Sequence, residues 1–371
     1  MRAVLRSITG IGSGRLRQII ACFGSATAAW RVPREAWRCF GETGWIEILW
    51  RERVKVDPVA VTENLHRQEI RLVMPGEKEY PTLLGELADA PPLLYYRGKL
   101  EPAAEALAVV GSRRATAYGK AAATHLAKEV ARRGVVIVSG LARGIDTAAH
   151  QGALAANGVT WAFLGCGLDT VYPAENQRLA AQITERGALI SEFAPGTPPE
   201  PGNFPARNRL ISGAARGVLV VEAAQRSGAL ITVDLALEQG REVFAVPGPI
   251  FSEMSLGPHQ LLRMGAKIVE NADDIWTEIG VWSDAGMPEA AVASAYAPDP
   301  GKKVSGSGAP ATGQPELHQK LLELLSDVPL HIDRIAMGCP LSAPEVALGL
   351  LELELAGKIL QLPGQHYVLK R

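Results

Sequence analysis

The chain has 371 residues, of which 47% are hydrophobic and 21% charged, the composition of an ordinary globular protein with room for two or three domains. The formal net charge of −1 excludes a generally basic protein, so nucleic-acid binding would have to come from a local patch. The four scattered cysteines form no CxxC pair, and no apolar run is long enough for a membrane span, so we expect a cytoplasmic protein with no membrane partner.

Residues 1–70 are expected to form a small helical domain. Gly10-Ile11-Gly12 precedes an amphipathic helix that should end at Gly24, and the next helix should begin near Ser25. A glycine hairpin before a helix can offer N–H groups to a DNA phosphate, and this segment has eleven Lys/Arg against seven Asp/Glu. The alternative is an interaction or packing module, because such glycines also serve any tight helix–helix turn.

Residues 71–105 are rich in Pro and Tyr and are expected to lead into the main domain. Pro91-Pro92 followed by LLYYRG predicts one edge strand after a rigid turn.

Residues 106–280 alternate short apolar runs with helical patterns, which predicts a Rossmann-like, doubly wound, mostly parallel sheet. In the first strand–helix–strand unit, Thr116 is the expected N-cap of the helix and Gly134 the residue that follows its end. The predicted strands are Ala106–Val110, Val135–Ser139, Trp161–Gly165, Ala188–Glu192, Gly217–Ala223 and Glu242–Gly248.

Glycine-rich turns follow nearly every predicted strand, and in a parallel sheet these turns share one edge. The first two turns also carry Arg113 and Arg143. Glycines with an arginine at a helix N-terminus suit an anion such as phosphate. The alternative is that the glycines only permit tight turns.

Residues 196–217 form a Pro-rich loop, after which Arg207 and Arg209 are expected to open a helix. Phe204 lies among polar residues at the end of the loop. Arginines beside an aromatic ring suit single-stranded nucleic acid, with guanidinium groups for phosphate and a ring for base stacking. The alternatives are a core anchor for Phe204 and surface ion pairs for the two arginines.

Residues 281–314 are rich in Ala, Gly, Pro and Ser and are expected to be a flexible linker. Residues 315–371 predict a winged helix, with three helices followed by two strands around Pro363-Gly364. This segment has seven acids and five bases, and its third helix carries Glu345, Glu352 and Glu354. We therefore favour a protein-contact or regulatory role for the winged helix over DNA reading.

Recognisable catalytic motifs are not found. Gly111 and Gly119-Lys120 are separated by seven residues, a longer spacing than in a Walker A loop. Asp146 and His150 lie four apart on a helix, where a cap and a packed histidine are favoured over half a metal site. Glu222 has no nucleophile or second acid at a recognisable spacing. We expect no catalytic residue, no metal and no cofactor.

Six motifs in order resemble those of the DNA-processing protein A family (DprA, also called Smf), over about residues 70–275. They are VVGSRRATAYG, VSGLARGIDTAAHQGAL, LGCGLDTVYPAEN, SEFAPGTPPEPGNFPARNRLISG, VVEAAQRSGALIT and ALEQGREVFAVPGPI. The resemblance implies a Rossmann-like domain that binds single-stranded DNA, a sterile-alpha-motif-like N-terminal domain and a C-terminal winged helix. It further implies a homodimer through the Rossmann-like domain, protection of DNA in natural transformation and loading of the RecA recombinase, and no enzyme activity.

Carried over by motif, the resemblance implies three groups of DNA-binding residues. A phosphate would be held by Gly111, Ser112 and Arg113, and the same groove would be lined by Ser139, Gly140 and Arg143. Base stacking and further backbone contacts would come from Asn203, Phe204, Arg207, Asn208 and Arg209. Some relatives have a lysine after Tyr-Pro where this chain has Ala174-Glu175, which would leave affinity more dependent on Arg113, Arg143 and Arg207.

Two rival functions are compatible with parts of the sequence. Nucleotide N-glycosidase-like enzymes share the first glycine-serine turn, but their PGGxGTxxE loop is replaced here by EAAQRSGALIT. A double-stranded-DNA regulator acting through the winged helix is opposed by the acidic third helix.

Overall fold

The computed structural model describes residues 1–41, 44–103 and 105–279, and beyond these residues 321–322, 325, 330–331, 335, 343–356, 358–362 and 366–369. The chain divides into two compact units, residues 1–286 and residues 287–371. Because the first unit continues across residue 70, the domain boundary expected there stays a prediction. Among the described residues, no helix is both long and apolar enough to cross a membrane.

A nine-stranded sheet in the order β1-β2-β6-β5-β4-β3-β7-β8-β9 forms the centre of the first unit. All pairs from β6 to β9 are parallel, which confirms the predicted Rossmann-like, doubly wound, mostly parallel fold. The strands are β1 (Arg71–Val73), β2 (Leu94–Gly98), β3 (Ala106–Val110), β4 (Val136–Ser139), β5 (Thr160–Phe163), β6 (Ala188–Ser191), β7 (Gly217–Val220), β8 (Glu242–Ala245) and β9 (Lys267–Ile268).

The strand predicted at LLYYRG is β2, but the expectation that it forms the edge of the sheet is wrong. β2 pairs antiparallel with β6 on one side and with β1 on the other. The very short β1 is the edge strand, and its three residues were too few to show a period in the sequence.

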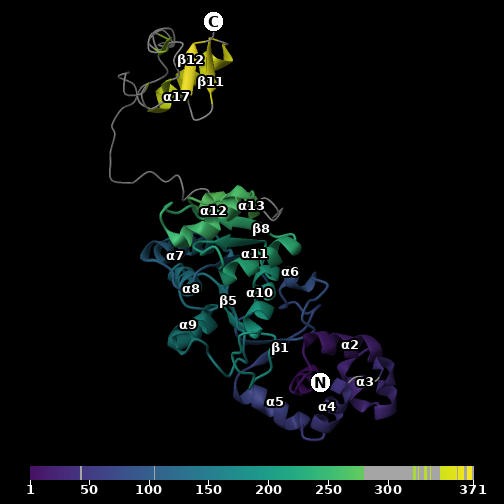
Figure 1. The fold of residues 1–371 in the computed structure, drawn as a ribbon. Coiled ribbons are helices and arrows are strands. Elements are labelled where there is room, and N and C mark those ends of the chain that lie inside the picture. Colours follow the sequence, from purple (N-terminus) through teal and green to yellow (C-terminus); the bar gives the residue numbers. More distant parts are fainter. Residues whose placement is uncertain are drawn as a thin grey trace, which may run out of the picture. The chain divides into compact units, whose positions relative to one another are not determined.

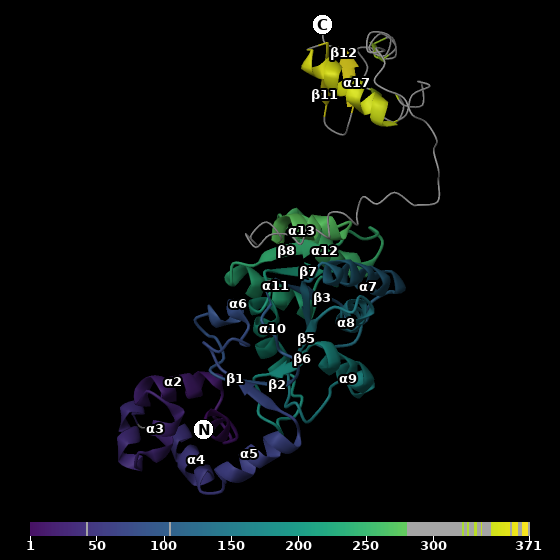
Figure 2. The same cartoon turned by 180° about the vertical axis from the view of Figure 1, so that it is seen from behind.

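Helices cover both faces of the sheet (Figures 1 and 2). Alternate residues of β3 face opposite layers, so Leu107 and Val109 pack with α7 and α8, whereas Ala108 and Val110 pack with α10 and α11. The helices are α6 (Thr82–Gly85), α7 (Ala117–Arg132), α8 (Ile145–Ala155), η2 (Ala174–Asn176), α9 (Gln177–Arg186), α10 (Asn203–Gly213), α11 (Gly228–Glu238), η3 (Glu253–Ser255), α12 (Leu256–Arg263) and α13 (Ala272–Ile279).

The ends of α7 agree with the sequence prediction. The Thr116 side chain accepts a hydrogen bond from the N–H of Gly119, as an N-cap does. Gly134 adopts φ +83° after the last turn, a conformation that glycine reaches without strain.

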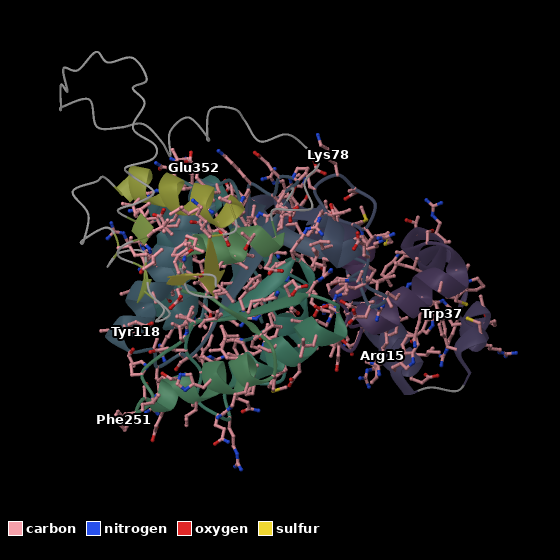
Figure 3. All side chains as sticks on the ribbon, turned by 90° about the horizontal axis from the view of Figure 1, so that it is seen from above. Arg15, Trp37, Lys78, Tyr118, Phe251 and Glu352 are labelled. Atoms are coloured by element: carbon pink, nitrogen blue, oxygen red, sulfur yellow. The ribbon has the colours of Figure 1, made fainter. Side chains whose placement is uncertain are left out.

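The segment before β1 is helical, as predicted. Gly24 ends α2 in the left-handed conformation, and Ser25 caps α3. The rings of Phe23, Trp37 and Phe40 pack against one another within this segment, and Figure 3 labels Trp37 there. The helices are α1 (Arg2–Arg6), α2 (Ser13–Phe23), α3 (Ala26–Arg31), η1 (Arg34–Phe40), α4 (Gly44–Arg53) and α5 (Pro58–Arg67).

The second unit contains a helix and a small antiparallel sheet in the order β10-β12-β11. This arrangement agrees with the predicted third helix and wing of a winged helix. The expected linker at 281–314, the wing turn and most of the two preceding helices lie outside the described residues. The elements are β10 (Leu330–His331), α17 (Ala343–Leu355), β11 (Ile359–Leu362) and β12 (His366–Leu369).

Candidate nucleic-acid interface

The main groove lies where the strand order reverses, between the carboxyl ends of β3 and β7. The chain moves outward from β3 to β6 and then returns to place β7 beside β3, and such a switch point leaves a crevice in an open α/β sheet. A groove of about 740 Å³ lies here. Its walls come from the turn after β3, the first turns of α10, and the loop that leads into α11.

The N-terminus of α7 is already occupied by a carboxylate of the protein. Glu222, just after β7, accepts hydrogen bonds from the N–H of Thr116 (2.8 Å) and from its hydroxyl (2.5 Å). A Cβ on Gly119 would lie 2.3 Å from this carboxylate, so a larger residue at position 119 would have to displace the Glu222 side chain. The N–H and hydroxyl of Thr116 are therefore engaged by Glu222, and the expectation that Gly111, Ser112 and Arg113 hold a phosphate stays a prediction.

The turn after β4 is organised in the same way by Asp146. Its carboxylate accepts from the N–H groups of Gly140 (3.1 Å) and Ala142 (3.3 Å), and it is buried. Burial raises the pKa of Asp146, while Arg207 and these N–H groups act in the opposite direction. Ser139 is fully buried and donates to the carbonyl of Val109 at 2.6 Å, so it does not line the groove as expected.

Arg207 lies beneath the groove, where only 3% of the residue is exposed. Its Nη1 donates to the carbonyl oxygens of Gly140 (2.6 Å) and Phe163 (2.5 Å), which joins α10 to the ends of β4 and β5. Burial lowers the pKa of Arg207 to about 10, and Asp146 opposes that shift, so the guanidinium stays charged at neutral pH. Nη1 of Arg207 is thus engaged within the protein, and the expected contact of Arg207 with a DNA backbone stays a prediction.

Exposed cationic and aromatic groups meet at the mouth of the groove. Phe204 lies in the first turn of α10, and not in the loop before it as expected, since the helix begins at Asn203. The guanidinium carbon of Arg113 lies 5.2 Å from the centroid of the Phe204 ring, and the Tyr172 ring lies 5.6 Å from it. Arg113 and Tyr172 are exposed and Phe204 is half-buried, so a planar ligand can reach this cluster.

Arg143 is exposed, but it forms a two-pronged ion pair with Glu175. Nε and Nη2 of Arg143 each lie 2.9 Å from a carboxylate oxygen. These hydrogen bonds lower the pKa of Glu175 and raise that of Arg143. The departure noted at Ala174-Glu175 therefore places an acid against one of the cations expected to bind phosphate.

Arg209 and Asn203 are not among the residues that line the groove. Arg209 donates to Glu192 at 2.7 Å and to the carbonyl of Asp89 at 3.1 Å, and Ser13 donates to the same Glu192 carboxylate at 2.8 Å. Arg209 thus joins α10 to the helices before β1, which agrees with the ion-pair alternative and corrects the expected backbone contact. Asn203, the first residue of α10, donates to the carbonyl of Pro198 in the preceding loop.

The structure thus brings together eight of the eleven residues proposed from the sequence and leaves out Ser139, Asn203 and Arg209. Sequence reasoning missed Tyr172 and Arg114, which also line the hollows. Tyr172 stands inside one of the recognised motifs, and its ring could have been noted there. The eight residues are Gly111, Ser112, Arg113, Gly140, Arg143, Phe204, Arg207 and Asn208.

Asp146 and His150 each have a hydrogen-bond partner within the protein, as the favoured interpretation of a cap and a packed histidine predicts. The Asp146 carboxylate accepts hydrogen bonds from backbone N–H groups. His150 forms a 2.7 Å hydrogen bond with the hydroxyl of Thr160. Within the part of the chain that the structure describes, no three His, Cys, Asp or Glu side chains are grouped to hold a metal ion.

These features define a Rossmann-like α/β protein with an open groove, lined by arginines and rings, at the carboxyl edge of its sheet. The chain belongs to the DNA recombination-mediator protein A (DprA/Smf) family, because residues 71–280 match that family. Residues 306–365 match the DprA winged helix domain.

Relatives and solved structures agree with this assignment. Protein Smf of Escherichia coli (strain K12) is 44% identical over 308 residues, covering 81% of this chain and 78% of the relative. DNA processing protein DprA of Bacillus subtilis (strain 168) is 43% identical over 57% of this chain and 72% of the relative. The X-ray structure of DprA from Streptococcus pneumoniae superposes with a TM-score of 0.67 at 35% identity, covering 75% of this chain and 98% of that one. A structure of DNA processing protein A from Helicobacter pylori, described for its single-stranded DNA binding mode, has a TM-score of 0.50 at 29% identity and covers 57% of this chain and 95% of that one.

Proposed function

We propose that this protein binds single-stranded DNA along the carboxyl edge of its Rossmann-like sheet and delivers it to the RecA recombinase in transformation or recombination. The observation that carries the binding proposal is the exposed Arg113 guanidinium beside the Phe204 ring, at the mouth of an open groove. A guanidinium can hold a phosphate, and the ring can stack a base of any sequence. Membership in the family and the single-stranded DNA binding mode described for the Helicobacter pylori protein support the same function.

The direct test is a fluorescence titration of single-stranded DNA at several salt concentrations. Arg113→Ala is expected to weaken binding to all sequences alike and to lower the salt slope by about 0.7, the share of one phosphate contact. Phe204→Ala is expected to cost about 1–3 kcal/mol of stacking, and Phe204→Tyr should retain binding. Lys78→Ala removes an exposed charge outside the groove and serves as the control. Wild-type affinity in both Arg113→Ala and Phe204→Ala would contradict the proposal.

Delivery to RecA is tested separately by following RecA filament formation on single-stranded DNA. The wild-type protein should shorten the lag before filaments grow, and Arg113→Ala should lengthen it again because less DNA is held. An unchanged lag with the wild-type protein would limit the function to DNA binding.

A homodimer through the Rossmann-like domain is the second part of the proposal. Exposed apolar side chains lie in the connection from β8 to β9 and in the edge strand β9 itself, where Ile250 is 75%, Phe251 95%, Met264 68% and Ile268 52% exposed. Figure 3 shows Phe251 at the periphery, pointing away from the ribbon. An edge strand with exposed apolar neighbours suits a second copy of the chain. Light scattering should report a dimer for the wild type and a monomer for Phe251→Glu/Met264→Glu.

Catalysis is not part of the proposed function. Glu222, the carboxylate just after β7, is 3% exposed and already serves the N-terminus of α7. Incubation with nucleoside monophosphates should release no free base, and release would favour the N-glycosidase alternative.

A further inference from the structure

A second hollow, of about 780 Å³, runs along the seam between α7 and α8. Its lining includes four basic side chains, Arg113, Lys120, Lys128 and Arg143, and one carboxylate, Glu175. This local excess of positive charge contrasts with the net charge of −1 for the whole chain. A hollow of this kind attracts a polyanion.

The packing of the two helices explains why the basic side chains line a groove. Gly152 of α8 approaches α7 so closely that a Cβ there would lie 2.4 Å from the carbonyl oxygen of Thr124. The Thr124 hydroxyl in turn donates to the carbonyl of Ala148 across the seam at 3.3 Å. The helix backbones therefore form a low floor, and the long side chains of Lys120 and Lys128 line it on the α7 side.

A small hollow lined by Arg113, Arg143 and Tyr172, among others, shares residues with both the main groove and the seam. Arg113 lines all three, so the seam is continuous with the main groove through Arg113. Arg143 likewise lines both the small hollow and the seam. A single polyanion that contacts Arg113 over Phe204 can thus continue along α7 without crossing an acidic surface, apart from Glu175.

The spacing of the two lysines along α7 fits phosphates that are three or four nucleotides apart in one strand. Lys120 and Lys128 are eight residues apart, so they lie on one helix face about 12 Å apart along the axis. That distance matches about three or four stacked nucleotides at about 3.4 Å each. Among the described residues that line the seam, only His125 carries an aromatic ring, so the contacts would be mainly to sugar-phosphate and not to bases.

We propose that the α7–α8 seam is a second DNA-binding segment, which holds the backbone of the same single strand after it leaves the Arg113–Phe204 cluster. This inference rests on the proposed function and extends it: the cluster binds bases and the first phosphate, and the seam adds phosphate contacts to longer strands only.

The test compares a short oligothymidylate of about 6 nucleotides with one of about 20, because site sizes for such proteins begin at about 4 nucleotides. In Lys120→Ala/Lys128→Ala, binding of the short strand should match the wild type. Binding of the long strand should weaken, and its salt slope should fall by about 1.4, the share of two phosphates. Lys120→Glu/Lys128→Glu should widen the difference between the two strands.

The matched control is Lys78→Ala/Arg132→Ala, which also removes two positive charges but none from the seam. It should leave the salt slope for the long strand unchanged, and thermal unfolding should show that each variant stays folded. Equal long-strand slopes in the seam variant and the wild type would overturn the seam while leaving the proposed function in place. Failure of the wild type to bind either strand would overturn both.

Discussion

The ion pair between Arg143 and Glu175 is expected to weaken DNA binding. Glu175→Gln removes the negative charge beside Arg143 while keeping the size of the side chain, so both the affinity for single-stranded DNA and its salt slope should increase, the slope by about 0.7. A titration at two or more salt concentrations measures this. Glu185→Gln removes a carboxylate outside the seam and should change neither quantity; weaker binding in Glu175→Gln would show that the ion pair positions Arg143 productively.

The buried Arg207 is expected to matter for stability more than for contact with DNA. Arg207→Met leaves the carbonyls of Gly140 and Phe163 without their donor and Asp146 without its counter-charge, so the free energy of unfolding should fall by about 3–5 kcal/mol. Arg207→Lys should recover little of the lost free energy of unfolding, because an ammonium lacks the planar, forked donors of a guanidinium. Urea unfolding measures both variants. If they unfold like the wild type but bind DNA poorly, the original assignment of Arg207 to a phosphate would be favoured.

At the scale of single residues, most of the residues proposed from the sequence line the groove or the small hollow. The sequence did not predict which of them are exposed and which are buried against other parts of the protein. Arg113 and Arg207 both stand in motifs beside glycine or aromatic residues, and nothing local distinguishes the exposed cation from the buried one. The difference arises from contacts far apart in the chain, since the partners of Arg207 are 67 and 44 residues away. The same holds for Arg209, whose partner Glu192 also accepts a hydrogen bond from Ser13 of α2.

For single elements, the N-terminus of α7 offers a test of the role assigned to Glu222. Glu222→Ala removes the acceptor of the Thr116 N–H and hydroxyl and should lower the free energy of unfolding by about 1.5–3 kcal/mol. Glu222→Gln should lose less, because one amide oxygen remains as an acceptor. Denaturant unfolding supplies the numbers, and DNA affinity corrected for folding should stay at the wild-type level. A large, selective loss of DNA binding would instead place Glu222 in the interface.

Strands and most helices could be predicted because their hydrophobic periodicity is strong and because capping residues and glycines mark their ends. β3 has the predicted bounds, and α7 has the predicted cap at Thr116. The start of α10 was missed because Pro205 and the preceding prolines indicate a loop, although proline is compatible with the first turn of a helix. The position of β2 inside the sheet depends on pairing with β1 and β6, which no local pattern reports.

For the molecule as a whole, the buried His150 leads us to expect that the free energy of unfolding falls in acid. The Thr160 hydroxyl donates to the carbonyl of Ile137, so it accepts from His150 Nδ1, and Nε2 is left as a buried acceptor without a partner. Burial lowers the pKa of His150 to about 3 from its ordinary value of 6.5, and Arg207 adds to the shift. Below pH 6.5 the unfolded chain therefore binds a proton at His150, whereas the folded protein leaves His150 neutral.

The contribution of His150 is complete above pH 6.5 and is lost as the pH falls, by about 1.4 kcal/mol per pH unit. His150→Gln should flatten the dependence of unfolding free energy on pH between about 6 and 4 by nearly one proton. Urea unfolding across this range in both proteins measures the change. Because the raised pKa of Asp146 acts in the opposite direction, the difference between the two curves, and not the wild-type curve alone, isolates His150. Parallel curves would contradict the prediction.

The seam between α7 and α8 offers four Lys or Arg side chains and, among the described lining residues, a single aromatic ring, that of His125. A strand gripped there only by its phosphates would turn its Watson–Crick edges toward the surrounding water. Those edges would stay free to test a complementary sequence while the protein still holds the strand, so homology could be sampled before release.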